Sequence, residues 1–512
     1  MEDFLRRGYS EAVAESHAFY DIAERITSFG KEWRYYLDID IPLLSDIAII
    51  VDYDYHERQG EPLYASLNSE QKVIVDGVLS AVERRLGGCF FVDGPGGSGK
   101  TYVYTAIYHL AIARRFKALT VAWTGIAANL LPNGRTASST FRLIVADQSR
   151  TSNMKRQSKE ARDLMSVDII IWDEAPMAPK LALEAVDALL QDLHQTSVPF
   201  GGKIMLLGGD FRQVLPVVEK GSRFDMVHAC IKRSVLWPLF HTFRLTANMR
   251  VSADDVSHKR WLLELGDGLL PVDGNLDAPV PTDLICCGDI VTAVFGDLLS
   301  GSSPDLTDAV ILTPRNVDAL RINDAVLDLL TGLKRTFLSE DEAVVEHPSD
   351  SLNFPTEFIN KMTPTGLPPH ALHIKVGCIV MLLRNLDVAN GLCNGSRFIV
   401  RQIGQRVLIC EHAVGDRQGY QVLIPRIDCY YTHQMLPFRL RRRQFPLRLS
   451  FAMTINKSQG QSFSKVGIAL HDPIFSHGQL YVAFSRCRSR KGIVVHAAQQ
   501  LMRNIVYDEV LR

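Results

Sequence analysis

The sequence predicts an α/β protein built on parallel sheets with crossover helices, followed by a part rich in short β-type runs. Two observations predict the parallel sheets. Strongly apolar runs alternate with helical patterns between residues 67 and 240, and these runs are GGCFFVDG, KALTVAWTG, VDIIIWDEA and GGKIMLLGGD. Gly, Asp or Thr stands at the end of each run, so polar groups gather at the carboxyl ends of strands, where such sheets bind ligands.

Composition narrows the class of protein. A chain of 512 residues exceeds one ordinary core, so two to four domains are expected. A hydrophobic content of 46% with 22% charged residues is that of a soluble globular protein. The net charge of −1 means that any polyanion must meet a local basic surface.

Cysteine use and the N-terminal residues predict an intracellular protein. The nine cysteines are scattered, odd in number and without a C-x-x-C pair, which favours reduced thiols over a zinc site. The first residues are partly acidic and lack an apolar core, so no secretory signal is expected. The most apolar early run is too short to cross a bilayer, and no membrane is expected as a partner.

Patterning divides the chain into five segments. Residues 339–371 are rich in proline and acidic residues and are expected to form surface loops. The expected segments are an N-terminal accessory region (1–66), a first α/β lobe (67–242, with a small insertion at about 142–166), the first part of a second α/β lobe (243–338), an inserted β-barrel with loops (339–445), and the completion of the second lobe (446–512).

The stretch VDGPGGSGKTY at residues 92–102 predicts a nucleotide site. It fits the phosphate-cradling pattern G-x-x-x-x-G-K-[ST], and an apolar strand precedes it while a helical pattern follows, as that pattern requires. Lys100 would reach the β- and γ-phosphates and Thr101 would bind Mg²⁺. The expected cradle consists of Gly94, Pro95, Gly96, Gly97, Ser98, Gly99, Lys100 and Thr101.

Acidic and amide side chains end the next two predicted strands. In VDIIIWDEAP, Asp173 can hold Mg²⁺ while Glu174 polarises an attacking water. The strand IMLLGGDFRQ ends with Asp210, Arg212 and Gln213. Two readings of Gln213 stay open at this stage, one as a γ-phosphate sensor or water-positioning group and the other as a loop amide.

Six motifs in order give the sequence a family resemblance. They resemble the motifs of the Pif-type (petite integration frequency) DNA helicases of superfamily 1B, and their sequences are most similar to those of Helitron transposon helicases. The six motifs are DEAPM, PFGGK, GGDFRQVLPV, LTANMR, TINKSQGQSF and HGQLYVAFSR. The resemblance runs from about residue 67 to the C-terminus. It implies two RecA-like P-loop lobes, the second interrupted by a small SH3-like β-barrel.

The resemblance implies roles for individual residues. Gln71 would contact adenine, and Arg250 and Arg486 would reach the γ-phosphate across a cleft, where guanidinium groups can neutralise developing charge. The implied catalytic set is Lys100, Asp173, Glu174, Gln213, Arg250 and Arg486, and Gly460 joins Gln71 and the cradle among the ATP-binding residues.

Single-stranded DNA would cross both lobes. The implied contacts are Thr124 and Gly125 in the first lobe, and Thr454, Asn456, Lys457, Ser458 and Gln459 in the second. A cation, a hydroxyl and amides on one short segment suit a phosphodiester backbone, and contacts of that kind position a strand without reading its sequence. The basic run RLRRR at residues 439–443 is either a solvated, import-like patch or part of a groove along the DNA.

The implied activity is that of a Mg²⁺- and ATP-dependent DNA helicase moving 5′-to-3′ on single-stranded DNA and unwinding duplexes. The family acts in replication, recombination, repair and telomere maintenance, which implies a nuclear protein. A monomer is expected, but the sequence leaves the oligomeric state open. Two positions depart from many relatives, Ser138 and Asn456, where histidine is common. No H-x-H sequence occurs, so the strand-nicking chemistry of full Helitron proteins is not expected.

Two other classes of protein stay open from the sequence. One is a transposon remnant that binds single-stranded DNA without catalysis, although the complete catalytic set argues against it. The other is an unrelated P-loop enzyme, such as a nucleotide kinase or switch, which the arginine motifs of the second lobe disfavour.

Overall fold

A computed structural model describes most of the chain after residue 50. The described residues are 15, 19, 51–85, 87–144, 151–218, 221–250, 255–300, 306–345, 354–364, 366–387, 390–415, 417–432 and 436–512. Much of the expected accessory region and residues 145–150 of the expected insertion therefore lie outside the described residues. Within the described ranges, none of the helices combines the length and the apolar character that a membrane span requires.

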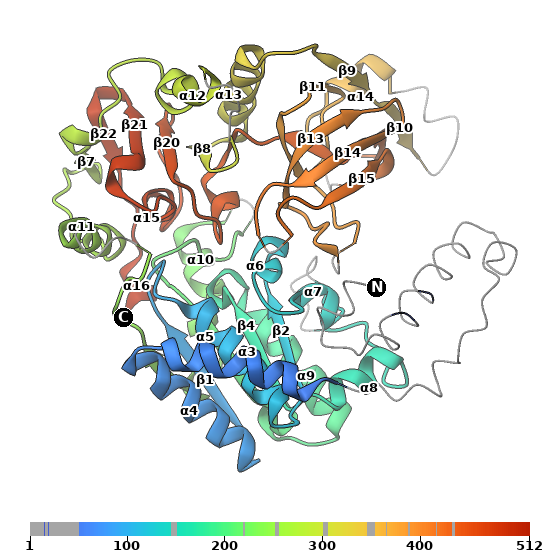
Figure 1. The fold of residues 1–512 in the computed structure, drawn as a ribbon, viewed down its shortest axis with the longest axis vertical. Coiled ribbons are helices and arrows are strands. Elements are labelled where there is room, and N and C mark those ends of the chain that lie inside the picture. The colour runs from blue at the N-terminus through green and yellow to red at the C-terminus, as the bar shows by residue number, and fades with distance from the viewer. Residues whose placement is uncertain are drawn as a thin grey trace, which may run out of the picture.

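The first lobe is a six-stranded parallel sheet in the order β3-β2-β4-β5-β1-β6 (Figure 1). Its strands are β1 (Gly88–Asp93), β2 (Ala118–Ala122), β3 (Arg135–Thr136), β4 (Ile169–Asp173), β5 (Ile204–Gly209) and β6 (Phe240–Arg244). β6 pairs with β1, so the first sheet extends just past the expected boundary at residue 242.

Alternation along the strands buries both faces of this sheet. In β4, Ile169 and Ile171 face the cluster around α4 and α5, whereas Ile170 and Trp172 face the cluster around α9. Helices therefore cover both sides, as a parallel sheet requires. The helices of this lobe are α3 (Tyr53–Ser66), α4 (Ser69–Glu83), α5 (Lys100–Ala113), α6 (Gly125–Asn129), α7 (Ala137–Thr140), α8 (Lys159–Met165), α9 (Lys180–His194) and α10 (Arg223–Ala229).

The second lobe has a four-stranded parallel sheet in the order β19-β8-β20-β21. Its strands are β8 (Ala309–Thr313), β19 (Ala452–Thr454), β20 (Lys465–Leu470) and β21 (Ile493–Ala497). One face packs on α12 (Ile290–Ser300) and α13 (Asn316–Leu329), and the other packs on α11 (Val256–Gly266) and α15 (Gln479–Ser485).

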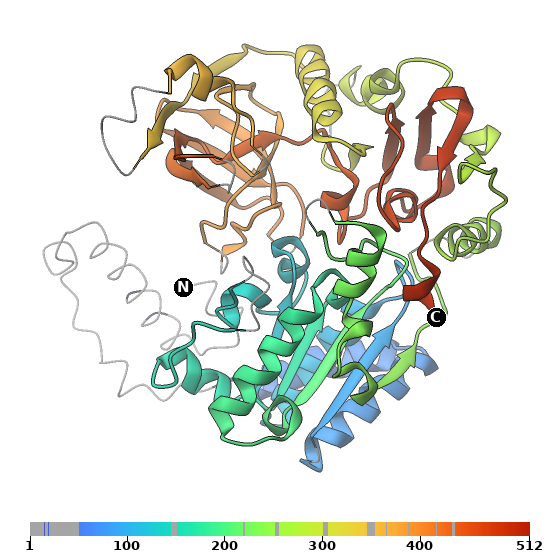
Figure 2. The same ribbon diagram turned by 180° about the vertical axis from the view of Figure 1, so that it is seen from behind.

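Antiparallel sheets separate β8 from β19 in the sequence, and they lie beside the second lobe in both views (Figures 1 and 2). The larger sheet has the order β15-β14-β13-β12-β18, a second has the order β10-β17-β16, and a third pairs β11 with β9. Their strands are β9 (Arg335–Leu338), β10 (Glu340–Val344), β11 (Ala371–Ile374), β12 (Ile379–Leu382), β13 (Arg397–Ile403), β14 (Val407–His412), β15 (Gln421–Pro425), β16 (Ile427–Tyr431), β17 (Arg439–Gln444) and β18 (Leu447–Leu449), with the short helix α14 (Thr356–Lys361). The apolar core of the second lobe continues into the larger sheet.

The basic run at residues 439–443 is part of an antiparallel sheet, with Arg439 and Arg443 exposed and Arg442 buried, and its role on DNA stays a prediction. It forms β17, which pairs with the acidic strand β10, so the expectation of surface loops is wrong for residues 340–344. Arg442 is fully buried and makes two bonds to Asp341, of 2.9 and 2.6 Å, while Arg441 reaches Glu342 at 2.6 Å. Opposite charges on facing strands stabilise the pairing of this sheet.

The chain end returns to the first lobe. After β21 the chain forms β22 (Leu501–Arg503), paired with β7 (Asp277–Pro279), and then the short helix α16 (Asp508–Leu511). Val510 packs into the α9 core of the first lobe, and Arg223 of α10 bonds Glu509 at 2.8 Å. The C-terminal segment thus runs from the second lobe to the first (Figure 1).

Candidate active site

The loop between β1 and α5 has the conformation of a phosphate cradle. Gly97 and Gly99 have φ angles of 87° and 82°, in the left-handed region that favours glycine. The Lys100 Nζ donates to the carbonyl oxygen of Gly94 at 2.6 Å, so the ammonium group lies inside the loop. Backbone N–H groups at the start of a helix, together with an enclosed cation, make a site for a phosphate chain.

Gln71 lies directly behind this loop. It forms a capping box with Asn68 at the start of α4, and its Nε2 donates to the carbonyl oxygen of Ser98 at 3.2 Å. A Cβ on Gly99 would come within 2.6 Å of the same Nε2, so glycine is needed there for the close approach. The implied adenine contact therefore adjoins the cradle, and its side chain supports the loop.

Two buried carboxylates end β4. Asp173 Oδ2 lies 3.5 Å from the hydroxyl of Thr101, and Asp173 Oδ1 accepts from the backbone N–H of Glu174 at 2.8 Å. Burial, and next the charge of Glu174, raise the pKa of Asp173 to about 7 against the opposing effect of Lys100. A divalent cation would relieve this crowding of negative charge, and a hydroxyl with a carboxylate is the ligand set that Mg²⁺ takes in P-loop sites.

The end of β5 brings a second polar group to the cleft. Arg212 bridges Asp210, at 3.3 Å, and Asp267 at the end of α11, at 2.7 Å. Gln213 is buried, and its Oε1 has no hydrogen-bond partner among the described residues. Gln213 is thus a buried amide of the loop after β5, and its role as a sensor or water-positioning group stays a prediction.

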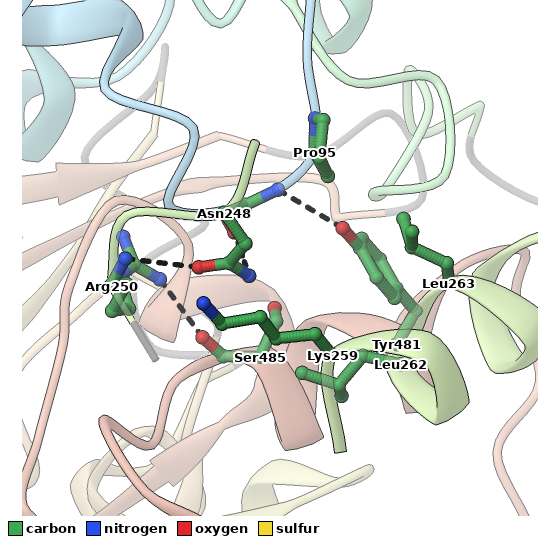
Figure 3. Close-up of a pocket in the computed structure, with 9 residues that line it drawn as sticks. Pro95, Asn248, Arg250, Lys259, Leu262, Leu263, Tyr481 and Ser485 are labelled. Carbon is green, nitrogen blue, oxygen red and sulfur yellow. Dashed lines mark hydrogen bonds between the residues drawn. The ribbon is translucent and has the colours of Figure 1, made fainter. Parts of the chain in front are cut away.

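Arg250, which lines a pocket beside the cradle (Figure 3), lies close to Arg486. Arg250 donates to the carbonyl oxygen of Ser485 at 2.9 Å, and the Arg486 NH2 would lie 3.5 Å from a Cβ on Gly96. Burial, and next the charge of Arg486, lower the pKa of Arg250 to about 10. Two cations held together at a phosphate cradle suit an anionic ligand.

A glutamine of the second lobe completes the acidic side of the cleft. Gln459 was expected on the DNA, but its Nε2 donates to Glu174 Oε2 at 3.0 Å and its side chain is buried. Ser458 is also fully buried, with its hydroxyl donating to the carbonyl oxygen of Ile455 at 2.7 Å. The 3₁₀ turn Ile455–Ser458 directs both side chains inward, so the structure does not place Ser458 or Gln459 on a surface open to DNA.

Lys457, from the same turn, lies against Arg448 of β18. Burial, and next the charge of Arg448, lower the pKa of Lys457 to about 8. Arg448 donates to Asn316 Oδ1 at 3.2 Å. Thr454 lies half-buried at the end of β19, and Asn456 accepts from Gln479 Nε2 at 3.0 Å, which ties this segment to α15.

The first-lobe residues expected on DNA lie at α6, which contacts the antiparallel part. Thr124 caps α6 through a 3.3 Å bond from the N–H of Ala127, and a Cβ on Gly125 would lie 3.0 Å from Cys393. The Asn129 side chain donates to Ser396 Oγ at 3.1 Å. Gly460 lies against α6, where an added Cβ would lie 3.7 Å from Ile126, and its expected part in ATP binding stays a prediction.

Comparison with known proteins decides the family. The model described as PIF1-like helicase matches residues 66–274, and the model described as the 2B domain of DNA helicase Pif1 matches residues 357–403. The chain belongs to the PIF1-like helicase family. The second match assigns part of the antiparallel sheets to the 2B domain.

Relatives in this family cover most of the chain. The ATP-dependent DNA helicase Pif1 of Bdellovibrio bacteriovorus is 29% identical over 83% of this chain and 87% of its own length. Human ATP-dependent DNA helicase PIF1 is 28% identical over 84% of this chain, and the aligned part is 60% of the human protein. The chain thus spans about three fifths of the length of the vertebrate relatives.

Solved structures of Pif1 proteins share the fold. Bacteroides Pif1 bound to ssDNA has a TM-score of 0.62 and 24% identity, covering 84% of this chain and 92% of that one. Pif1 helicase from Candida albicans has a TM-score of 0.61 and 23% identity, covering 87% and 98%. At these identities the likeness establishes the arrangement of two RecA-like lobes with a 2B domain.

Sequence reasoning missed two residues of this Pif1-family site, Tyr481 and Asn248. The Tyr481 hydroxyl donates to Asp210 Oδ2 at 2.9 Å and accepts from the Gly96 N–H at 3.0 Å (Figure 3). The only signal was its place in the motif YVAFSR, where a tyrosine in an apolar helix indicates core packing. Asn248, in LTANMR, also reaches the cradle and donates to the Gly96 carbonyl oxygen at 3.1 Å.

Proposed function

We propose that the protein is an ATP-dependent DNA helicase that moves along single-stranded DNA and unwinds duplexes. One observation carries the proposal, namely that both lobes build the nucleotide site. Arg486 and Gln459 of the second lobe, with Arg250 of the segment between the lobes, adjoin a cradle and carboxylates of the first. A site divided in this way can convert nucleotide turnover into lobe movement.

The chemistry we propose is phosphoryl transfer to water. Lys100 would bind the β- and γ-phosphates, and Glu174 would accept a proton from the attacking water. Gln213 would hold that water through its free Oε1 as the acceptor, or would donate to the γ-phosphate through its Nε2. Arg250 and Arg486 would neutralise the charge that develops on the γ-phosphate.

Mg²⁺ fits the residues at the end of β4. Thr101 and Asp173 would hold the ion, since their oxygens already lie 3.5 Å apart in a buried, negatively charged corner. When bound, Mg²⁺ would offset the negative charge of the phosphates. Gln459 would keep Glu174 oriented beside it through the 3.0 Å bond.

DNA would contact both lobes. Lys457, Asn456 and Thr454 supply the second-lobe surface in the proposal, and Thr124 with Gly125 supplies the first. The relatives support DNA as the substrate, because they are ATP-dependent DNA helicases and one related structure is bound to ssDNA. We extend the proposal to 5′-to-3′ movement, a monomeric, nuclear protein, and work in replication, recombination, repair and telomere maintenance or in Helitron transposition, on the motif resemblance.

The test is the ATPase rate with and without single-stranded DNA. We expect the purified protein with Mg²⁺ to hydrolyse ATP several-fold faster when single-stranded DNA is added, because DNA binding closes the divided site. Replacing Lys100 by Ala should abolish turnover while circular dichroism shows an intact fold, since the ammonium group serves the phosphates. Lys117→Ala, which removes an exposed lysine of the same lobe, should leave the rate unchanged.

Two results would remove the proposal. Turnover retained by the Lys100→Ala protein would refute the phosphate cradle as the catalytic site. An ATPase rate that does not respond to DNA would refute the motor. Single-stranded DNA binding without any hydrolysis would instead support the remnant that binds DNA without catalysis.

A further inference from the structure

Tyr481 joins the second lobe to the backbone of the phosphate cradle by a side-chain hydrogen bond. Its ring is buried in α15, and its single hydroxyl joins the Gly96 N–H, at 3.0 Å, to Asp210, at 2.9 Å. Burial, and next the charge of Asp210, raise the pKa of Tyr481 well above its ordinary value. The hydroxyl therefore stays protonated, and it must donate to the carboxylate and accept from the amide.

The neighbouring arginine does not make this connection. The Arg486 guanidinium bonds within its own lobe, to the carbonyl oxygens of Val482 and Gln461, at 3.0 and 3.2 Å, and to Ser485 Oγ, at 2.8 Å. Arg486 follows directly after α15, so its position relative to the phosphates depends on where that helix is held. Tyr481 holds it against the cradle.

Packing on both sides of α15 fixes this tyrosine. Gly478, with φ of 72°, starts the helix against the backbone of Arg212 and Gln213, so closely that a Cβ would overlap their carbonyl groups. A Cβ on Gly266 would lie 2.9 Å from both Arg212 and the Tyr481 ring. The segment after β5 and the helix with Arg486 are therefore in tight contact, and a shift of one will be felt by the other.

Gly96 lies at the γ-phosphate end of the cradle. The Lys100 Nζ, which in P-loops reaches the β- and γ-phosphates, lies 2.6 Å from the carbonyl oxygen of Gly94 and 3.3 Å from that of Pro95. The Gly96 amide follows directly in the chain. The Tyr481 hydroxyl therefore occupies an N–H that a γ-phosphate oxygen would take, whereas a diphosphate would not extend to it.

We propose that Tyr481 is a positioning residue whose hydroxyl holds the Gly96 amide until the γ-phosphate of ATP replaces it. The exchange releases α15 from the cradle and lets Arg486 turn toward the γ-phosphate, while Asp210 keeps its hydrogen bond from the hydroxyl. ADP leaves the Tyr481–Gly96 bond in place. This inference rests on the proposed ATPase, and it adds the group that distinguishes triphosphate from diphosphate.

The experiment compares Tyr481→Phe with the wild type in nucleotide binding without DNA. Removing the competing hydroxyl should tighten binding of a non-hydrolysable ATP analogue and leave ADP binding unchanged, so the ratio of the two affinities should rise several-fold. In turnover with DNA, kcat should fall about tenfold with no rise in KM, which corresponds to the loss of one hydrogen bond to a charged group. A tyrosine with only a structural role would change both nucleotides alike.

Tyr108→Phe is the matched control. Tyr108 is buried in α5, its hydroxyl accepts from Asn133 at 2.7 Å, and it lies outside the cleft, so this variant should behave as wild type. Asp210→Asn provides a second test if Tyr481→Phe is unstable. It weakens the bond from the Tyr481 hydroxyl to Asp210 that orients the hydroxyl toward the Gly96 amide, so the ratio of the two affinities should rise in this variant too.

Two results would overturn the inference. The first is an unchanged analogue-to-ADP ratio in Tyr481→Phe, and the second is a parallel weakening of both nucleotides. Neither depends on DNA. The proposed motor fails separately. It would be refuted if the ratio of analogue to ADP affinity changes in Tyr481→Phe as expected while the wild type shows no DNA-stimulated hydrolysis, and the role of Tyr481 would then stand.

Discussion

Single charged residues in the cleft are each held at a cost that a bound nucleotide would offset. On one side, burial and Glu174 raise the pKa of Asp173 to about 7. On the other, burial and Arg486 lower the pKa of Arg250 to about 10, against the opposing effect of Glu174. Negative charge is crowded at the expected metal position and positive charge at the expected γ-phosphate position. A triphosphate with its Mg²⁺ supplies the opposite charge at both places.

Lys457 gives a prediction at the residue scale. Its pKa of about 8 means that the ammonium form, which a phosphate binds, prevails below pH 8 and is lost above it. If Lys457 contacts DNA, affinity for single-stranded DNA should fall by up to about tenfold between pH 7 and pH 9, because binding then requires uptake of a proton. Fluorescence anisotropy at constant ionic strength measures this change.

Lys457→Arg is the control for that titration. Arginine keeps its charge throughout this range, so the variant should bind with little dependence on pH. An equal decline in both proteins would show that Lys457 is not the group that titrates on the DNA.

Individual strands differ in how far their sequence predicts them. Ile169, Ile170, Ile171 and Trp172 predict β4 because a strand covered by helices on both faces must be apolar throughout. β10 and β17 are charged, and their sequences predict loops or a basic patch. Their charges neutralise one another only after pairing, and pairing between segments about 100 residues apart leaves no local pattern.

The candidate site likewise has features that its local sequence predicts and features that it does not. Its backbone motifs were predictable, since glycines at left-handed positions and carboxylates at strand ends have local causes. The orientations of the Ser458 and Gln459 side chains were not predictable, because a 3₁₀ turn of four residues sets them. Tyr481 also escaped prediction, since its partners Gly96 and Asp210 lie far away in the sequence.

The ion pairs between β10 and β17 give a prediction at the scale of elements. Asp341→Asn leaves Arg442 buried with its charge uncompensated, so the antiparallel part should lose about 3 to 5 kcal/mol of stability. Urea unfolding followed by hydrogen exchange in β10 and β17 measures the loss. Glu342→Gln, which breaks the partly exposed pair with Arg441 on the same strand, should cost about 1 kcal/mol or less. Equal losses would contradict the role of the buried pair.

The whole molecule is organised around contacts between parts that are distant in sequence. Gln459 and Tyr481 reach the first lobe beside the nucleotide cradle, and α6 meets the antiparallel part through Asn129 and Ser396. The surface expected to hold DNA and the surface expected to hold nucleotide thus adjoin the same contacts between the parts of the molecule. We therefore expect nucleotide state and DNA grip to change together, which is the requirement for a motor.

Unwinding of tailed duplexes is the most direct test of this central claim. The account predicts that the protein with ATP and Mg²⁺ separates a duplex carrying a 5′ single-stranded tail, and does so far more slowly with a 3′ tail or with a blunt end. Strand separation is followed by release of a fluorescent strand. Failure to separate any tailed duplex, under conditions where ATP is hydrolysed, would contradict it.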